Sequence, residues 1–225
     1  MTQINAEEQL RQLESRGREI VLNPEILISA FPEIDIEEID FDTIKPGSYR
    51  FNKKPSLEFL SKMPYYKSGE IGIVCFNDVW FVTFSEENQL EVPFPLDIKS
   101  LRSIKALKCH IHSHPANAST RDFSYLPSDI DLDFCGFTTD STQFIVSEHG
   151  LTVLTANPNI SDYRNRFFNW VIHDLKLSKN EFVSNGFGLI KDFCINNLNY
   201  RLIPWHEVKN FMDNQEIFTQ KSPHK

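Results

Sequence analysis

Hydrophobic residues gather in short runs through the middle of the chain, and turn-forming residues separate these runs. The runs that predict strands are 71–76, 79–84, 104–112, 143–147 and 151–156. Asn77-Asp78 links the first two runs and Glu148-His149-Gly150 links the last two, so we expect each pair to form a β-hairpin. The pattern therefore predicts a sheet that contains two hairpins.

Other segments carry apolar residues at helical spacing. One predicted helix begins at Ser56, a favoured N-cap residue, and ends at Pro64. The other predicted helices cover 6–20, 163–177, 182–198 and 206–212. Together with the strands they predict an α/β fold, a three-layer sandwich in which a mixed sheet is covered by helices.

The length of 225 residues suits one large domain, or a domain of about 120–150 residues with extensions. We expect a core over 51–160, an N-terminal extension over 1–50 and a C-terminal helical extension over 161–225. The N-terminal extension includes an acidic segment, 33–42, in which isoleucines alternate with carboxylates. That pattern suits a strand, a docking segment or a solvated face, so no site is assigned to it.

Composition and charge exclude several classes of protein. The net charge is −8 and the basic residues are scattered, which argues against a nucleic-acid-binding surface. No apolar run approaches the roughly 18 residues that span a bilayer, and no signal sequence is recognisable, so we expect no membrane association. The four cysteines lie singly in apolar surroundings and predict reduced thiols, which together with the missing signal sequence indicates a cytoplasmic location.

Candidate chemistry appears in the segment 109–115, which reads Cys-His-Ile-His-Ser-His-Pro. Alternate side chains of a strand point to the same side, so the three histidines share one face, and Pro115 ends the strand where they emerge. Two such imidazoles can bind one zinc ion, and a catalytic zinc takes three protein ligands and leaves a fourth position for water. Asp131 is the candidate third ligand, because it lies one turn inside a helix predicted to begin at Pro127-Ser128.

The motif His-Ser-His-Pro over 112–115, followed by Ser128-x-x-Asp131, resembles the signature of the JAMM (MPN-plus, JAB-domain) zinc metalloproteases. The resemblance covers about the middle half of the chain and implies an MPN-like sandwich with one zinc per chain. The implied zinc ligands are His112, His114 and Asp131. It also implies that Glu70 is the general acid and base and that Ser128 stabilises the oxyanion. His110 has no counterpart as a ligand and is either a donor to the ligands or an ordinary strand residue.

The spacing departs from the family, because twelve residues separate Pro115 from Ser128, about twice the usual number. Ser119-x-x-Asp122 offers a competing motif with a shorter spacing. We prefer Asp131, because Ile130, Phe134 and Phe137 give its segment helical periodicity, whereas Asp122 lies in a polar run.

The implied reaction is cleavage of an isopeptide or peptide bond after the C-terminal tail of ubiquitin or a ubiquitin-like protein. The expected partners are that substrate and the activating and conjugating enzymes of its pathway. A composition rich in Asn, Lys and Ile suits a bacterial member. Two alternatives remain open: an inactive MPN-like scaffold without zinc, and a protein of the RadC type associated with DNA. The acidic charge and the absence of a glycine after Pro115 count against the second alternative.

Overall fold

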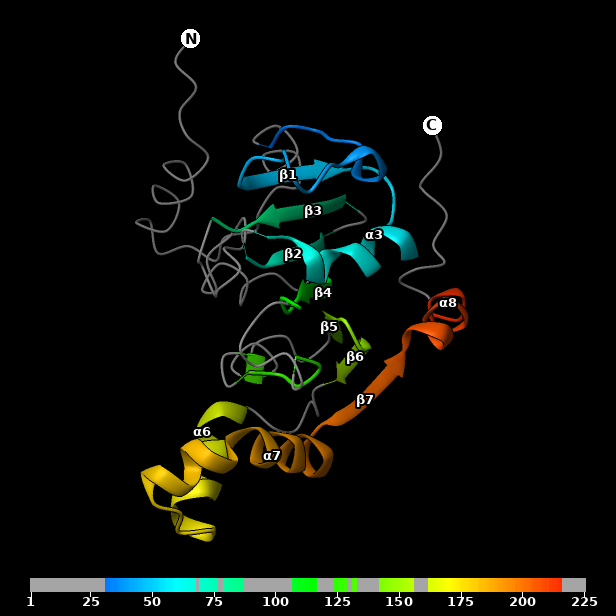
Figure 1. The fold of residues 1–225 in the computed structure, drawn as a ribbon. Coiled ribbons are helices and arrows are strands. Elements are labelled where there is room, and N and C mark those ends of the chain that lie inside the picture. Colours follow the sequence, from blue (N-terminus) through cyan, green and yellow to red (C-terminus); the bar gives the residue numbers. More distant parts are fainter. Residues whose placement is uncertain are drawn as a thin grey trace, which may run out of the picture.

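The protein is an α/β structure built on one mixed sheet (Figure 1). The structure, a computed structural model, describes residues 31–67, 69–76, 79–86, 107–116, 124–128, 131–132, 142–155 and 162–215. Its strands are β1 (Gly47–Phe51), β2 (Ile71–Phe76), β3 (Val79–Phe84), β4 (Leu107–Ser113), β5 (Thr142–Ser147), β6 (Gly150–Thr155) and β7 (Asn199–Pro204). Its helices are η1 (Ile36–Glu38), α3 (Leu57–Lys62), η2 (Met63–Tyr65), α6 (Tyr163–Asn169), η4 (Trp170–Asp174), α7 (Lys179–Asn197) and α8 (Trp205–Asp213).

The seven strands within these residues lie in the order β1-β3-β2-β4-β5-β6-β7. Only β4 and β5 run parallel, and every other neighbouring pair is antiparallel. The predicted hairpins are present as β2–β3 and β5–β6. The strand β7 was not predicted, and it adds an edge strand to a segment that we expected to be wholly helical.

Two apolar clusters cover opposite faces of the sheet. Phe144 and Val146 on β5 belong to a cluster that also includes residues of α3 and α8, whereas Ile145 between them belongs to a cluster with residues of α6 and α7. Alternate strand residues point to opposite faces, so helices pack on both faces of the sheet. Figure 1 shows α6 and α7 together near β6 and β7, at the end of the sheet away from β1.

The acidic segment 33–42 packs on the sheet instead of standing apart from it. Ile36 is buried, and the Asp35 carboxylate accepts a hydrogen bond from the Glu37 N–H at 3.1 Å to cap η1. Phe41 packs edge-on against Phe59, with ring centroids 5.4 Å apart. The expected boundary at residue 50 lies inside β1, and the helix expected over 6–20 lies outside the described residues.

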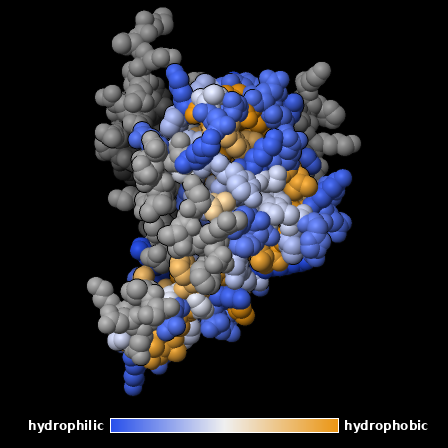
Figure 2. Space-filling model, viewed as in Figure 1, coloured by the Kyte–Doolittle hydropathy of each residue, from blue (hydrophilic) through white to orange (hydrophobic). Residues whose placement is uncertain are grey.

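The helices predicted over 56–64, 163–177, 182–198 and 206–212 are present. Most of the helix predicted from Pro127-Ser128 lies outside the described residues. Ser56 caps α3 by accepting the Phe59 N–H at 3.0 Å, and Pro64 lies in η2, which ends this helical segment. The three C-terminal helical patterns correspond to α6 with η4, to α7 and to α8. The visible face in Figure 2 is mostly hydrophilic, with hydrophobic groups at several places, among them the region where α6 and α7 lie. No helix in the described part of the chain combines the length and the apolar character that crossing a membrane requires.

Alanine substitutions at two glycines should change the stability of the fold in opposite directions. Gly150 begins β6 with a φ of +144°, and a Cβ there would overlap the Ile203 carbonyl on β7. At Gly186, inside α7, a Cβ meets no atom of the described residues within 4 Å. We expect Gly150→Ala to lower the free energy of unfolding by about 2 kcal/mol or more. Gly186→Ala should raise it by about 0.5–1 kcal/mol. Urea denaturation measures both, and equal effects would contradict the close approach of β6 and β7.

Candidate metal centre

The strand β4 places its histidines on the face of the sheet that carries α6 and α7. Ile111 lies in the cluster with α3 and α8, so His110 and His112 on either side of it point to the other face. His112 lies opposite Gly72 on β2 and Ile145 on β5. His114 is one residue beyond Ser113, the end of β4, but its N–H donates to the Val146 carbonyl at 2.9 Å, which continues the pairing with β5.

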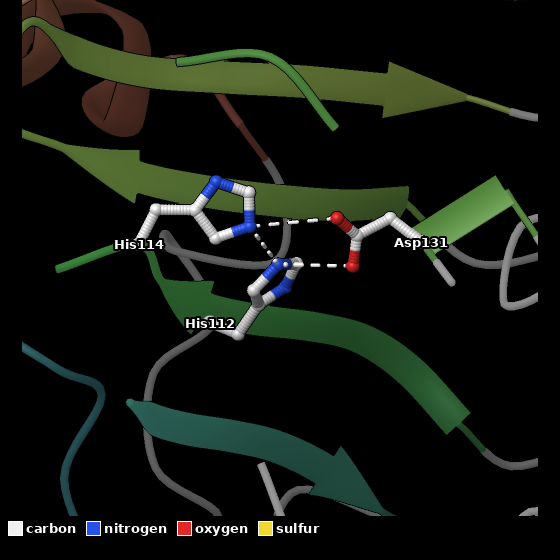
Figure 3. A group of neighbouring side chains, drawn as sticks. All are labelled: His112, His114 and Asp131. Atoms are coloured by element: carbon white, nitrogen blue, oxygen red, sulfur yellow. Dashed lines mark hydrogen bonds and ion pairs between the residues drawn. The ribbon is translucent and has the colours of Figure 1, made fainter. Parts of the chain in front are cut away.

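Three side chains converge on one point above this face, as Figure 3 shows. The Nε2 atoms of His112 and His114 lie 3.1 Å apart. Asp131 Oδ1 lies 3.1 Å from His112 Nε2, and Asp131 Oδ2 lies 3.4 Å from His114 Nε2. Ligands about 2.0–2.1 Å from a tetrahedral zinc are separated by about 3.3–3.4 Å. The three side chains therefore form a group that could hold a metal ion.

A backbone carbonyl fixes the orientation of His114. Its Nδ1 lies 2.8 Å from the carbonyl oxygen of Ser124, which can only accept a hydrogen bond. Nδ1 therefore carries a proton, and Nε2 is the ring nitrogen that faces the point where the three side chains meet. For His112 Nδ1, no hydrogen-bond partner is found among the described residues.

Asp131 is held by the turn that it helps to form. The Ser128 N–H and hydroxyl donate to Asp131 Oδ2 at 2.6 and 2.8 Å, and the Asp131 N–H donates back to Ser128 Oγ at 3.2 Å. This reciprocal arrangement is that of a capping box at a helix start. Gln143, buried on β5, donates to the other oxygen, Asp131 Oδ1, at 3.4 Å. Both carboxylate oxygens are thus positioned before any metal binds.

The electrostatics of the group favour a charged pair. Burial alone would raise the pKa of Asp131, but the charge of His112 and hydrogen bonds from His112 and His114 hold it well below its usual value. Burial would lower the pKa of His114, but the hydrogen bond and charge of Asp131, the charge of Glu70 and the Ser124 carbonyl raise it to about 9. A carboxylate and a protonated imidazole therefore face each other at neutral pH.

His110 lies outside the group of three. Its ring stacks on His112 with centroids 4.8 Å apart and an angle of 16° between the planes. Burial and the neighbouring His112 lower its pKa well below the usual value, so His110 is neutral. A neutral ring can stack closely on His112 without charge repulsion, which makes His110 a packing partner of that ligand.

Glu70 lies at the same end of the sheet as His114. It directly precedes β2, which runs antiparallel to β4, so the start of β2 lies beside the end of β4. The Glu70 N–H donates to Ser85 Oγ at 2.7 Å, and the Ile71 N–H donates to Ser113 Oγ at 2.9 Å. The charge of Glu70 acts on His114, but Glu70 is not one of the three converging side chains.

The structure therefore brings together the three predicted ligands, with Glu70 nearby. Asp122, the alternative to Asp131, lies outside the described residues. The sequence analysis did not identify Ser124 or Gln143 as neighbours of the site. Gln143 gave a detectable signal, a polar residue in an apolar strand, whereas a backbone carbonyl such as that of Ser124 gives none.

The raised pKa of His114 predicts that metal binding releases a proton. At pH 7 the imidazole is protonated because its pKa is about 9, and Nε2 must lose this proton to bind a metal. Apparent zinc affinity should therefore rise about tenfold per pH unit up to about pH 9. Asp131, already ionised, contributes no proton. Calorimetry in buffers of different ionisation enthalpy measures the released protons, and binding without proton release would contradict the charged pair.

Known proteins give no independent assignment of this arrangement. No family model, no curated protein and no solved structure matches the chain.

Proposed function

We propose that the chain is a zinc metalloprotease of the JAMM type with an MPN-like sandwich fold. Its reaction is hydrolysis of an isopeptide or peptide bond after the C-terminal tail of ubiquitin or a ubiquitin-like protein. The observation that carries the proposal is the triangle of the side chains His112, His114 and Asp131. The two Nε2 atoms lie 3.1 Å apart, and each faces its own oxygen of Asp131, Oδ1 at 3.1 Å from His112 and Oδ2 at 3.4 Å from His114. Two imidazoles and one carboxylate are a donor set typical of catalytic zinc.

The arrangement of the chain around the triangle supports the MPN-like fold. The helix α3 precedes Glu70, the β2–β3 hairpin follows it, and β4 then carries the histidines beside β2. The turn that begins at Ser128 supplies Asp131 before the chain enters β5. This is the order of elements that the resemblance implies, with the acidic residue and the metal ligands at one end of the sheet.

Different residues of the chain would bind the ion, transfer protons and stabilise the oxyanion. His112, His114 and Asp131 would hold the ion and leave its fourth position open. Bound zinc lowers the pKa of a water to about 7 and polarises a carbonyl. Glu70 accepts the proton of the attacking water and returns it to the leaving amine, so one carboxylate serves both proton transfers. Ser128 keeps Asp131 in place through its hydroxyl and backbone N–H, and the same hydroxyl is the candidate donor to the oxyanion.

A reducing compartment suits the cysteines. Cys75, Cys109 and Cys194 are buried thiols, and Cys75 lies directly opposite Cys109 on the neighbouring strand. Reduced thiols in such positions are typical of cytosolic proteins. We therefore place the protein in the cytoplasm, where a ubiquitin-like substrate and the activating and conjugating enzymes of its pathway would be its partners.

The ligand set predicts about one zinc per chain in the purified protein. His112→Ala and His114→Ala should each abolish zinc binding, because two remaining ligands do not hold the ion. Asp131→Asn should weaken binding, whereas Asp122→Asn, its matched control, should not. Elemental analysis and chelator competition provide the measurement. Full zinc retention in the His112→Ala, His114→Ala double variant would remove the proposed site, and a loss only in Asp122→Asn would move the third ligand.

The proposed role of Glu70 predicts loss of turnover without loss of metal. Glu70→Gln should retain zinc and lower the cleavage rate by about 10²–10⁴, because the amide cannot accept the proton. Glu58→Gln, at an exposed glutamate of α3 paired with Lys62, is the matched control and should cleave normally. The assay is gel-based cleavage of ubiquitin and ubiquitin-like fusions. Wild-type rates for a zinc-loaded Glu70→Gln protein would refute the mechanism, and no cleavage of any fusion by the wild type would refute the substrate class.

A further inference from the structure

We propose that Thr152, on β6, is a positioning residue for the metal centre, because its hydroxyl holds the loop whose carbonyl orients His114. This inference rests on the proposed function, since it concerns the same metal ligands. It extends the site to a residue that would not touch metal or substrate. It also gives a structural role to residues 124–126, which precede Ser128.

Two successive carbonyls of the loop carry the argument. The Ser124 carbonyl accepts the His114 Nδ1 hydrogen at 2.8 Å, and the Tyr125 carbonyl accepts the Thr152 hydroxyl at 2.6 Å. Ser124 is 3% exposed and Thr152 is fully buried, so water does not compete readily with either bond. Because the two carbonyls belong to adjacent peptide units, the bond to Thr152 also restricts the position of the Ser124 carbonyl.

Residues 125 and 126 of this loop pack near β6 and the turn between β5 and β6. The Tyr125 ring stands edge-on to His149 in the β5–β6 turn, with centroids 5.4 Å apart, and Leu126 is buried. Thr152 also lies opposite Leu202 on β7 in the sheet. Thr152 therefore lies between the C-terminal edge strand and the loop, and through the loop it connects β7 with His114.

The register of the sheet excludes a direct effect of Thr152 on the metal. His112 lies opposite Ile145, and Ile145 lies opposite Thr152, so Thr152 is two strands from the ligand. Two strand spacings are about 9–10 Å. The hydrogen-bonded segment 124–125 is therefore the route by which we propose that Thr152 influences metal binding.

The same row of residues supplies a matched control on the other side of His112. Gly72 lies opposite His112, and Thr83 lies opposite Gly72, so Thr83 is also two strands away on the same face. Thr83 is 2% exposed, and its hydroxyl hydrogen bonds to the Ser48 hydroxyl at 2.9 Å, away from the ligand loop. The two threonines thus match in distance from His112, in burial and in face, and they differ in what their hydroxyls contact.

The test compares zinc affinity in the full-length variants Thr152→Val, Thr152→Ser and Thr83→Val. Valine keeps the shape of threonine but removes the hydroxyl, and serine keeps the hydroxyl. Substitutions beside metal ligands typically weaken binding by 10–100-fold, and Thr152 acts one step further out. We therefore expect the zinc dissociation constant to rise about tenfold in Thr152→Val and to change by less than about threefold in the other two variants. The visible spectrum of bound Co²⁺, which reports ligand geometry, should change only in Thr152→Val.

The outcomes separate this inference from the proposed function. Equal zinc affinities in Thr152→Val and Thr83→Val would overturn the inference while the metal site stands. A wild-type protein that binds no zinc would overturn the metal site, and the inference with it. If Thr152→Val does not fold, Thr152→Ala and Thr152→Ser provide the comparison, because both lack the methyl group and they differ only in the hydroxyl. Equal affinities in that pair would again overturn the role of Thr152.

Discussion

The structure around the metal centre depends on one constraint, the charge of a carboxylate in a nearly dry interior. The Asp131 side chain is 11% exposed and those of His112 and His114 are 3% and 15% exposed. A buried carboxylate destabilises a fold unless hydrogen bonds and opposite charge compensate it. Here Ser128 and Gln143 supply hydrogen bonds, and His112 and His114 supply electrostatic attraction. The same compensation places two imidazole nitrogens and a carboxylate oxygen close enough to share an ion.

The sheet explains why these groups meet where they do. Because β4 is antiparallel to β2 and parallel to β5, the start of β2 and the ends of β4 and β5 lie at the same end of the sheet, along the strand direction. At that end of the sheet Glu70 precedes β2 and His114 follows β4, while His112 lies inside a strand paired on both sides. Ligands on paired strands are positioned more accurately than ligands on loops. His114 and Asp131 lie outside the named strands. His114 donates a hydrogen bond to the Ser124 carbonyl, and Asp131 accepts one from the Ser128 N–H.

The sequence predicted what depends on local periodicity. The side-chain alternation of a strand is sufficient to place His112 and His114 on one face, and the Ser56 cap and the two hairpins follow from equally local rules. The strand β7 was missed because an edge strand pairs on one side only, and Asn199, Arg201 and Pro204 weaken its pattern. The contacts of Ser124 and Thr152 were missed because they involve backbone carbonyls, which every residue carries.

A metal ion held by His112, His114 and Asp131 would compete with a proton for the same place. A proton on His114 offsets the charge of Asp131, so the protein's own groups compensate the buried carboxylate. A bound ion would replace that proton and add its binding free energy to the stability of the fold. Binding would be tightest where the ligands are already in place, because the ion then costs little further conformational entropy. The hydrogen bonds that Ser128 and Gln143 donate to Asp131, and the one that the Ser124 carbonyl accepts from His114, provide that preorganisation. They link the stability of the fold to its capacity to hold a metal.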